Sequence, residues 1–327
     1  MAAGKAFLRR IRVIGVVLAM ALASASQAQN WPERPVRIVV PFAVGSFTDT
    51  YARQFAQRLS EKLRGSFVVE AKGGAAGIIG VDFVAKSAPD GYTILFAGGA
   101  PLAVNPAIYK SLPYDALNDF APIAYLGETG YYMIVPPRSP HRSFAELVAA
   151  GKARPNAISI GGGNSNALLG VELFKLLIGT EVTSVPYKAA GAGLTEMLGG
   201  NIDAMIVDAG FAAGQLRANA VRGLAITTPR RSVLFPDIPT VNEVGYPDLQ
   251  VIKGWFGSWA PARTPVAILD RLNAAFTESK AEMAQQIRNA GNSMDAAGPS
   301  REDFGRFHRE DIERFRKLIR DARVPLK

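Results

Sequence analysis

Cysteine is absent from this chain of 327 residues, and histidine occurs only twice, at His141 and His308. The absence of cysteine excludes disulfide bonds, a thiol nucleophile and a cysteine-based metal site. Two isolated histidines give little support for a transition-metal site or for a histidine-dependent catalytic group. We therefore expect no metal and no cofactor, and we interpret both histidines as residues of a solvated loop or helix surface.

Concentrated positive charge is also missing. Lysine and arginine number 37 against 28 aspartates and glutamates, but they are scattered, without a basic block or interleaved aromatic residues. Proteins that follow a phosphate backbone need such a cluster, so the sequence predicts no nucleic-acid binding. Without residues 1–28 the formal charge is +5, which favours small anions as ligands. The 48% hydrophobic content is typical of a globular protein of one large or two medium domains.

The N-terminal apolar run, residues 13–22, is too short to span a bilayer. It is preceded by four basic residues and by no acidic one: Lys5, Arg9, Arg10 and Arg12. Ser26-Gln27-Ala28 then fits the small-x-small cleavage pattern. Residues 1–28 are thus predicted to be a signal peptide that directs the chain to the periplasm. A single N-terminal membrane anchor is the alternative.

Short β-branched runs alternate with segments of helical period along most of the remaining chain, which predicts an α/β fold with parallel sheets covered by helices. Strands are expected at residues 36–41, 67–70, 93–97, 158–160, 183–185, 204–207 and 223–227. Helices are expected after residue 49, where one apolar stripe recurs, at residues 168–178 and 194–198, and at 300–322. The last helix opens with a capping-box variant, Ser300-Arg301-Glu302-Asp303, and we expect it to pack on the first lobe.

Two uninterrupted apolar stretches, residues 121–135 and 255–261, have no clear helix or strand boundary. We interpret them as the places where the chain crosses between two lobes. The predicted organisation is a signal peptide at 1–28, a first lobe at 29–127 plus 253–327, and a second lobe at 128–252.

Two catalytic or cofactor sites are suggested by partial motifs. A dinucleotide fingerprint starting at Gly45 would need small residues where Phe47 and Thr50 stand, so it fails. The segment 163–167, Gly-Asn-Ser-Asn-Ala, approaches the nucleophile elbow of a hydrolase but has alanine at the second glycine. An exported hydrolase that acts on a small carboxylate or ester, in the ligand cleft predicted below, is kept as an alternative function. An acid–base pair among Asp49, Glu128 and Asp208 also stays open.

Several loops are rich in glycine and in small hydroxyl or amide residues and follow expected strands. They are residues 42–49, 72–80, 98–105, 161–166 and 187–193. Backbone N–H groups and short donors at the carboxyl ends of parallel strands suit a carboxylate. Several such loops in one chain predict a ligand-binding cleft.

The order of motifs along nearly the whole mature chain resembles one family. The motifs are Trp31-Pro32-Glu33-Arg34-Pro35-Val36-Arg37, Val39-Val40-Pro41-Phe42, Thr48-Asp49, Ala85-Lys86-Ser87-Ala88-Pro89-Asp90-Gly91-Tyr92-Thr93, Asn105-Pro106, Leu112-Pro113-Tyr114-Asp115, Asp119-Phe120-Ala121-Pro122, Val185-Pro186-Tyr187-Lys188, Leu198-Gly199-Gly200-Asn201-Ile202-Asp203, Arg231-Ser232, Phe235-Pro236-Asp237-Ile238-Pro239-Thr240 and Trp255-Phe256-Gly257. The chain is similar to Bug-type periplasmic solute-binding receptors of the tripartite tricarboxylate transporter systems.

The resemblance implies a two-lobed periplasmic binding protein of type II-like fold, each lobe a mainly parallel sheet covered by helices, with the ligand cleft between the lobes. It implies a monomer that performs no chemistry. Such a receptor closes its lobes over a small organic carboxylate and delivers it to a membrane permease. The solute could be a di- or tricarboxylate, an aromatic carboxylate or an acidic amino acid.

The ligand loops of the family correspond to sixteen positions here. They are Phe42, Gly45, Ser46, Thr48, Asp49, Gly77, Gly98, Gly99, Ala100, Gly162, Gly163, Asn164, Ser165, Asn166, Lys188 and Asp208. Backbone amides and bridging waters are expected to supply most hydrogen bonds, with Lys188 as the one cation placed to add charge.

The chain departs from the family in its opening loop, usually Pro-Phe-Pro-Pro-Gly-Gly-Gly-Thr-Asp, by losing two prolines and two glycines and gaining Phe47. We hypothesise that Phe47 lines the cleft and selects an aromatic carboxylate by stacking; the alternative is outward packing under a neighbouring loop. Asp49 should repel a carboxylate, so its simpler role is to cap the helix or hold the loop. Contact with a solute is sensible only if the solute also carries an ammonium group, and Asp208 raises the same question.

Overall fold

The computed structural model describes residues 31–289, 292–293, 300–321, 324 and 326. The expected signal peptide, residues 1–28, lies outside the described residues. Among the described residues, no helix combines the length and the apolar character that a membrane crossing requires.

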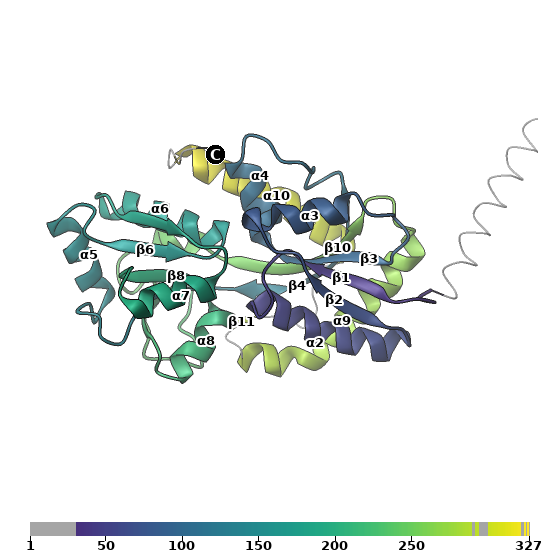
Figure 1. The fold of residues 1–327 in the computed structure, drawn as a ribbon, viewed down its shortest axis with the longest axis horizontal. Helices are drawn as coiled ribbons and strands as arrows, with labels where there is room; N and C mark the ends of the chain where they lie inside the picture. The colour runs from purple at the N-terminus through teal and green to yellow at the C-terminus, as the bar shows by residue number, and fades with distance from the viewer. Residues whose placement is uncertain (1–30, 290–291, 294–299, 322–323, 325, 327) are drawn as a thin grey trace, which may run out of the picture.

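Two sheets organise the described chain, at the right and the left of Figure 1. The first sheet has the order β11-β4-β10-β3-β1-β2 and the second the order β7-β6-β8-β5-β9. The strands of the first sheet are β1 (Val36–Val40), β2 (Phe67–Ala71), β3 (Thr93–Gly98), β4 (Phe120–Thr129), β10 (Gly254–Pro261) and β11 (Asn292–Ser293). Those of the second are β5 (Tyr131–Val135), β6 (Ser159–Gly162), β7 (Thr183–Pro186), β8 (Ala204–Asp208) and β9 (Arg222–Ile226). The seven strands expected from the sequence are confirmed within two residues at each end.

Helices cover both faces of each sheet, and we call each sheet with its helices a lobe (Figure 1). The helices are α2 (Phe47–Leu63), α3 (Ile78–Ala85), α4 (Asn105–Ile108), α5 (Phe144–Ala153), α6 (Ser165–Ile178), α7 (Ala190–Gly199), α8 (Ala209–Arg217), α9 (Val266–Asn289) and α10 (Arg301–Asp321). Three short helical turns are η1 (Ala75–Gly77), η2 (Ala100–Val104) and η3 (Pro247–Val251). Several segments expected to be loops are therefore partly helical, because α2, η2 and α7 begin within them.

Alternate residues of the strands enter different cores, because successive side chains of a strand point to opposite faces. In β1, Ile38 packs with α2 and α9, whereas Val39 packs with α3 and α10. In β5, Met133 packs with α5 and α6, whereas Tyr132 packs with α7 and α8. Burial on both faces explains why these strands are apolar almost throughout.

Both sheets are mixed, which corrects the expectation of mainly parallel sheets. β1 runs parallel to β2 and β3, and β6 runs parallel to β7 and β8. β10 is antiparallel to β3 and β4, and β5 is antiparallel to β8 and β9. The antiparallel strands lie next to the points where the chain leaves one sheet and returns to it. The apolar stretch 121–135 supplies β4 to the first sheet and β5 to the second, and the stretch 255–261 is part of β10.

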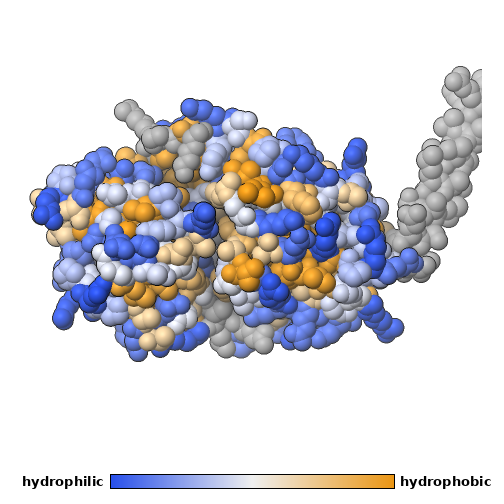
Figure 2. Space-filling view, in the orientation of Figure 1, coloured by the Kyte–Doolittle hydropathy of each residue, from blue (hydrophilic) through white to orange (hydrophobic). Residues whose placement is uncertain are grey.

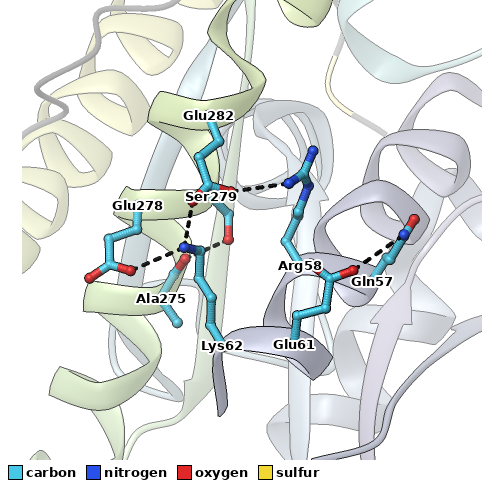
Figure 3. A network of polar contacts seen from close by, with 8 residues as sticks. All are labelled: Gln57, Arg58, Glu61, Lys62, Ala275, Glu278, Ser279 and Glu282. Carbon is cyan, nitrogen blue, oxygen red and sulfur yellow. Dashed lines mark hydrogen bonds and ion pairs between the residues drawn. The ribbon is translucent and has the colours of Figure 1, made fainter. Parts of the chain in front are cut away.

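The first lobe is held together at its outer edge and through its C-terminal helix. Figure 3 shows α2 and α9 side by side, with Lys62 Nζ 3.1 Å from Glu278 and 2.7 Å from Glu282, which also contacts Arg58. On the other face, α10 packs on β4 and β10, and the predicted capping box is confirmed by bonds between Ser300 and Asp303 in both directions. The expected packing of this helix on the first lobe is confirmed.

Candidate functional site

A cavity of about 30 Å³ lies between the two lobes. It is lined by Phe42, Thr48, Gly98, Gly99, Ala100, Thr129, Tyr131, Asn164, Asn166, Asp208, Gly254, Trp255 and Phe256. The surface view is hollowed where the two halves of the molecule meet (Figure 2). The lining therefore combines strand ends and helix starts of both lobes.

The first-lobe wall is built from backbone and aromatic rings. Thr48 lies in the first turn of α2, Gly98 ends β3, and Gly99 follows it directly before η2. The first N–H groups of a helix have no partner within the helix, so the start of α2 presents donors on this side. A Cβ atom on Gly99 would lie 2.6 Å from the indole of Trp255, so glycine is needed for the close approach of that ring.

The second-lobe wall carries side-chain acceptors. Asn164 caps α6, its Oδ1 accepting from Ala167 N at 2.9 Å and from the Tyr131 hydroxyl at 3.4 Å. Asp208 caps α8, its Oδ1 accepting from Phe211 N at 2.9 Å. Both caps occupy N–H groups of their own helices, and both side chains line the cavity.

Asn166 contributes an acceptor with no partner. Its side chain is 1% exposed, and its Nδ2 donates to the carbonyl of Lys253 at 3.1 Å. Within the described residues, Asn166 Oδ1 has no hydrogen-bond partner. A buried acceptor without a donor is costly, so a group that enters the cavity and donates to it would be favoured.

Asp208 is the one carboxylate among the lining residues, which include no lysine, arginine or histidine. Burial raises the pKa of Asp208 above its ordinary value, although the N–H of Phe211 opposes that shift. Burial, and to a smaller extent the nearby Asp208, also raises the pKa of the Tyr131 phenol. The site is thus uncharged apart from Asp208.

Of the seventeen positions expected to contact the ligand, including Phe47, eight line the cavity. These are Phe42, Thr48, Gly98, Gly99, Ala100, Asn164, Asn166 and Asp208. The other nine are not among the lining residues: Gly45, Ser46, Phe47, Asp49, Gly77, Gly162, Gly163, Ser165 and Lys188. Lys188 is exposed just before α7, so it brings no charge to this cavity.

Asp49 holds the opening loop, as its simpler interpretation predicts. Ser46 caps α2 by accepting from Asp49 N at 3.2 Å, and the Asp49 carboxylate accepts from Gly45 N at 3.0 Å. Arg53 pairs with the same carboxylate at 3.0 Å. The aspartate is therefore neutralised within its own helix turn.

Phe47 contacts the opposite lobe. Its ring centroid lies 5.5 Å from those of Tyr51 and Phe256, in the first lobe. On its other side is Gly210 of α8, where a Cβ atom would lie 2.3 Å from the Phe47 ring. The ring thus sits against the backbone of α8, which neither of the two interpretations from the sequence foresaw.

A second contact between the lobes is polar. The hydroxyl of Ser165, at the start of α6, donates to Asn105 Oδ1 at 2.6 Å. Asn105 is fully buried and also donates from Nδ2 to the carbonyl of Ala76 at 3.0 Å. The hydroxyl that resembled a nucleophile therefore bonds to an amide.

The surface interpretation of His308 is wrong. The side chain is 4% exposed, lies against Trp255 and Trp259, and has Nε2 2.8 Å from the carbonyl of Leu102. The prediction placed His308 on the exposed face of its amphipathic helix, whereas the side chain lies on the buried face. Among the described residues, no cluster of three or more His, Cys, Asp or Glu side chains could hold a metal ion.

Sequence reasoning missed five lining residues, all from the segments where the chain changes lobes: Thr129, Tyr131, Gly254, Trp255 and Phe256. The signal was present, because these residues lie in or beside the two apolar stretches interpreted as crossings. Strands that cross between two lobes form the floor of the cleft, so the polar and aromatic residues of these stretches could have been predicted to line the cavity.

Comparison with known proteins agrees with this geometry. A family model described as a tripartite tricarboxylate transporter family receptor matches residues 51–324. Protein BugT of Bordetella pertussis is 34% identical over 323 residues, covering 98% of this chain and 99% of that protein.

Solved structures superpose over most of the chain. The periplasmic binding protein BugD gives a TM-score of 0.85 at 28% identity, covering 91% of this chain and all of that chain. R. palustris Rpa4515 with adipate gives 0.84 at 31% identity, with the same coverage. MatC from Rhodopseudomonas palustris with bound malate gives 0.81 at 26% identity, covering 88% of this chain and all of that chain. The two-lobed fold and the resemblance seen in the sequence are confirmed, and the chain belongs to the tripartite tricarboxylate transporter receptor family of periplasmic solute-binding proteins.

Proposed function

We propose that this receptor captures a small organic carboxylate between its lobes and delivers it, chemically unchanged, to a membrane permease. The observation that carries the proposal is the cavity between the lobes, whose walls come from both sheets and include the start of α2. A helix start stabilises an anion without a cationic side chain. Two similar proteins are known with adipate and with malate, which supports a small carboxylate as the solute. The proposal covers a di- or tricarboxylate, an aromatic carboxylate or an acidic amino acid.

Capture requires the lobes to separate and close. A cavity of about 30 Å³ has room for water but not for a dicarboxylate. The crossing segments are suited to a hinge because they lie side by side where the chain changes sheets, with Gly254 of β10 paired to Thr129 at the end of β4. Glu128 and Lys253 pair at 3.0 Å, and the Thr227 hydroxyl joins Tyr131 N to the carbonyl of Ile252 at 2.9 and 2.7 Å.

The same proposal covers the organisation and location of the chain. Residues 1–28 act as the signal peptide for export to the periplasm. The first lobe comprises residues 29–127 plus 253–327 and the second residues 128–252, and the receptor acts as a monomer. The sheets support these boundaries, since the chain passes from β4 to β5 at Gly130 and enters β10 at Gly254.

A thermal-shift screen of carboxylates tests the function. A solute at about one hundred times its dissociation constant should stabilise the fold by roughly 2.7 kcal/mol. Small-angle scattering should show a smaller radius of gyration when the hit is added, and mass spectrometry should recover it unchanged. Failure of every carboxylate to stabilise the protein would contradict the proposal, and a product that disappears in Ser165→Ala would favour the hydrolase instead.

A further inference from the structure

The two walls of the cavity differ in the hydrogen-bonding partners they offer. The start of α2 is capped by Ser46, which does not line the cavity. The starts of α6 and α8 are capped by Asn164 and Asp208, which do line it. Each cap occupies one N–H group of its own helix, but only the two second-lobe caps, Asn164 and Asp208, also present their oxygens to the cavity.

Asp208 retains accepting capacity toward the cavity. An ionised carboxylate has about four lone-pair positions; Oδ1 accepts from Phe211 N at 2.9 Å, and the backbone N–H groups of Asp208 itself and of Gly210 also act on the carboxylate. Among the described residues that line the cavity, none carries a cationic side chain that could neutralise this group. A second carboxylate brought directly against Asp208 would be repelled.

Asn166 gives an independent indication of the same chemistry. Its orientation is fixed because Nδ2 donates to Lys253 O, so the partnerless atom is the acceptor Oδ1. Its side chain is almost fully buried, and it lines the cavity beside the start of α6. A carboxylate cannot satisfy an acceptor, but a hydroxyl or an ammonium group can.

We infer that the solute carries a hydrogen-bond donor, a hydroxyl or an ammonium group, close to its carboxylate, and that Asp208 and Asn166 recognise this donor. The carboxylate then faces the first lobe, where the start of α2 donates. This inference rests on the proposed function and narrows it to substituted carboxylates, either hydroxy acids or amino acids. Unsubstituted diacids leave Asn166 Oδ1 unpaired and place a charge near Asp208, so they should bind more weakly.

Matched solutes that differ at one carbon test the inference by calorimetry. One trio is succinate, malate and aspartate; others are glutarate, 2-hydroxyglutarate and glutamate, and propionate, lactate and alanine. In at least one trio, the hydroxy or amino member should bind about tenfold or more tightly than the unsubstituted acid, because a site that loses a buried donor rejects the analogue. If the hydroxy acid binds more tightly than the amino acid, the donor of the solute is a hydroxyl group; if the amino acid binds more tightly, it is an ammonium group.

Asp208→Asn separates recognition from folding, because asparagine is as good a helix cap as aspartate. In this variant the preference for the amino over the unsubstituted acid should fall about tenfold, and the unsubstituted acid should bind more tightly as the repulsion is lost. Asp303→Asn, at the cap of α10 in the first lobe, should leave both affinities unchanged. Equal binding of substituted and unsubstituted acids in every trio would overturn the inference and leave the carboxylate receptor standing. If no carboxylate binds at all, the proposed function itself fails.

Discussion

Two of the contacts between the lobes have opposite character. Beside Asn164 and Asn166 the contact is polar, a 2.6 Å hydrogen bond from Ser165 to the buried Asn105. Beside Thr48 and Asp208 it is apolar, the ring of Phe47 against the backbone of Gly210.

If the lobes close over a solute as proposed, the contrast predicts that closure can be tuned separately at the two ends of the cavity. A hydrogen bond depends on direction and on the loss of water from both partners, whereas a ring against a glycine depends only on space. Phe47 also lies in the opening loop, where the sequence differs from the pattern that the family resemblance leads us to expect. Its partner Gly210 leaves room for the ring, so the apolar contact is a pairing of two residues distant in the sequence.

Gly210→Ala should have the largest effect. A Cβ atom would overlap the Phe47 ring, and overpacking costs about 1–3 kcal/mol, so the solute affinity should fall by about tenfold or more. The variant should still fold, because alanine is the better helix former in α8. Isothermal calorimetry with the solute found in the screen measures the loss.

Two further variants make the result specific to the apolar contact. Gly214→Ala, in the same helix but with nothing within 4 Å of the added Cβ, should bind like the parent. Phe47→Ala combined with Gly210→Ala should recover most of the affinity, because the overlap is relieved. Loss of affinity in Gly214→Ala, or no recovery in the double variant, would show that the pairing does not limit closure.

Ser165→Ala should weaken closure at the polar contact by a smaller amount. Removing the hydroxyl takes a donor from the buried Asn105 Oδ1 in the closed arrangement, at a cost of about 1–2 kcal/mol, whereas water can reach Asn105 when the lobes separate. Affinity should therefore fall about tenfold while the melting temperature without solute changes little.

The matched control for that variant is Ser279→Ala. Its hydroxyl is equally buried but donates within α9, to the carbonyl of Ala275 at 2.6 Å, away from the contact between the lobes. It should alter stability without altering affinity. A Ser165→Ala protein that loses stability but keeps its affinity would assign this hydrogen bond to folding rather than closure.

Lowering the pH should reduce the stability of the fold without changing these two contacts between the lobes. None of the residues in those contacts, Ser165, Asn105, Phe47 and Gly210, has a side chain that titrates. Burial holds the pKa of His308 below its ordinary value of about 6.5, so the unfolded chain takes up the proton first. The stability present above about pH 6.5 is lost as the pH falls toward the folded-state pKa, by at most about 1.4 kcal/mol per pH unit from this group.

Urea unfolding at pH 8, 7, 6 and 5 measures that dependence. His308→Gln should flatten the part of the stability profile between pH 7 and pH 5. Identical pH dependence in the parent and His308→Gln would refute the assignment.

The sequence predicted the frame of the molecule better than its contacts. β-branched runs identified seven strands, because burial on both faces leaves a continuous apolar signal. The sequence pattern could not show that the sheets are mixed, because the relative direction of neighbouring strands depends on where the chain crosses between the lobes. The two apolar stretches were recognised as crossings, but their residues Tyr131 and Trp255 were not considered as part of the cavity.

The same limit applies to the individual side chains of the site. Loop composition indicated Asn164, Asn166 and Asp208, which line the cavity, but equally Lys188, which does not. The pairing of Phe47 with Gly210 joins residues 163 positions apart, and nothing in the local pattern of either residue specifies the other. His308 shows a different limit: a polar residue on an amphipathic helix can be buried where a backbone carbonyl accepts a hydrogen bond from it, here that of Leu102.

The smallest effect is expected from Lys62→Ala, which removes the ion pairs between α2 and α9 on the outer edge of the first lobe (Figure 3). Exposed ion pairs contribute little, because water solvates the separated charges nearly as well and salt screens the attraction. The solute affinity should stay within about twofold of the parent, and any loss of stability should shrink further at high salt. This variant perturbs the first lobe but changes neither the Ser165–Asn105 hydrogen bond nor the packing of Phe47 on Gly210. A large loss of affinity here would mean that the position of α2, and with it both Phe47 and Thr48, depends on its outer ion pairs rather than on its packed inner face.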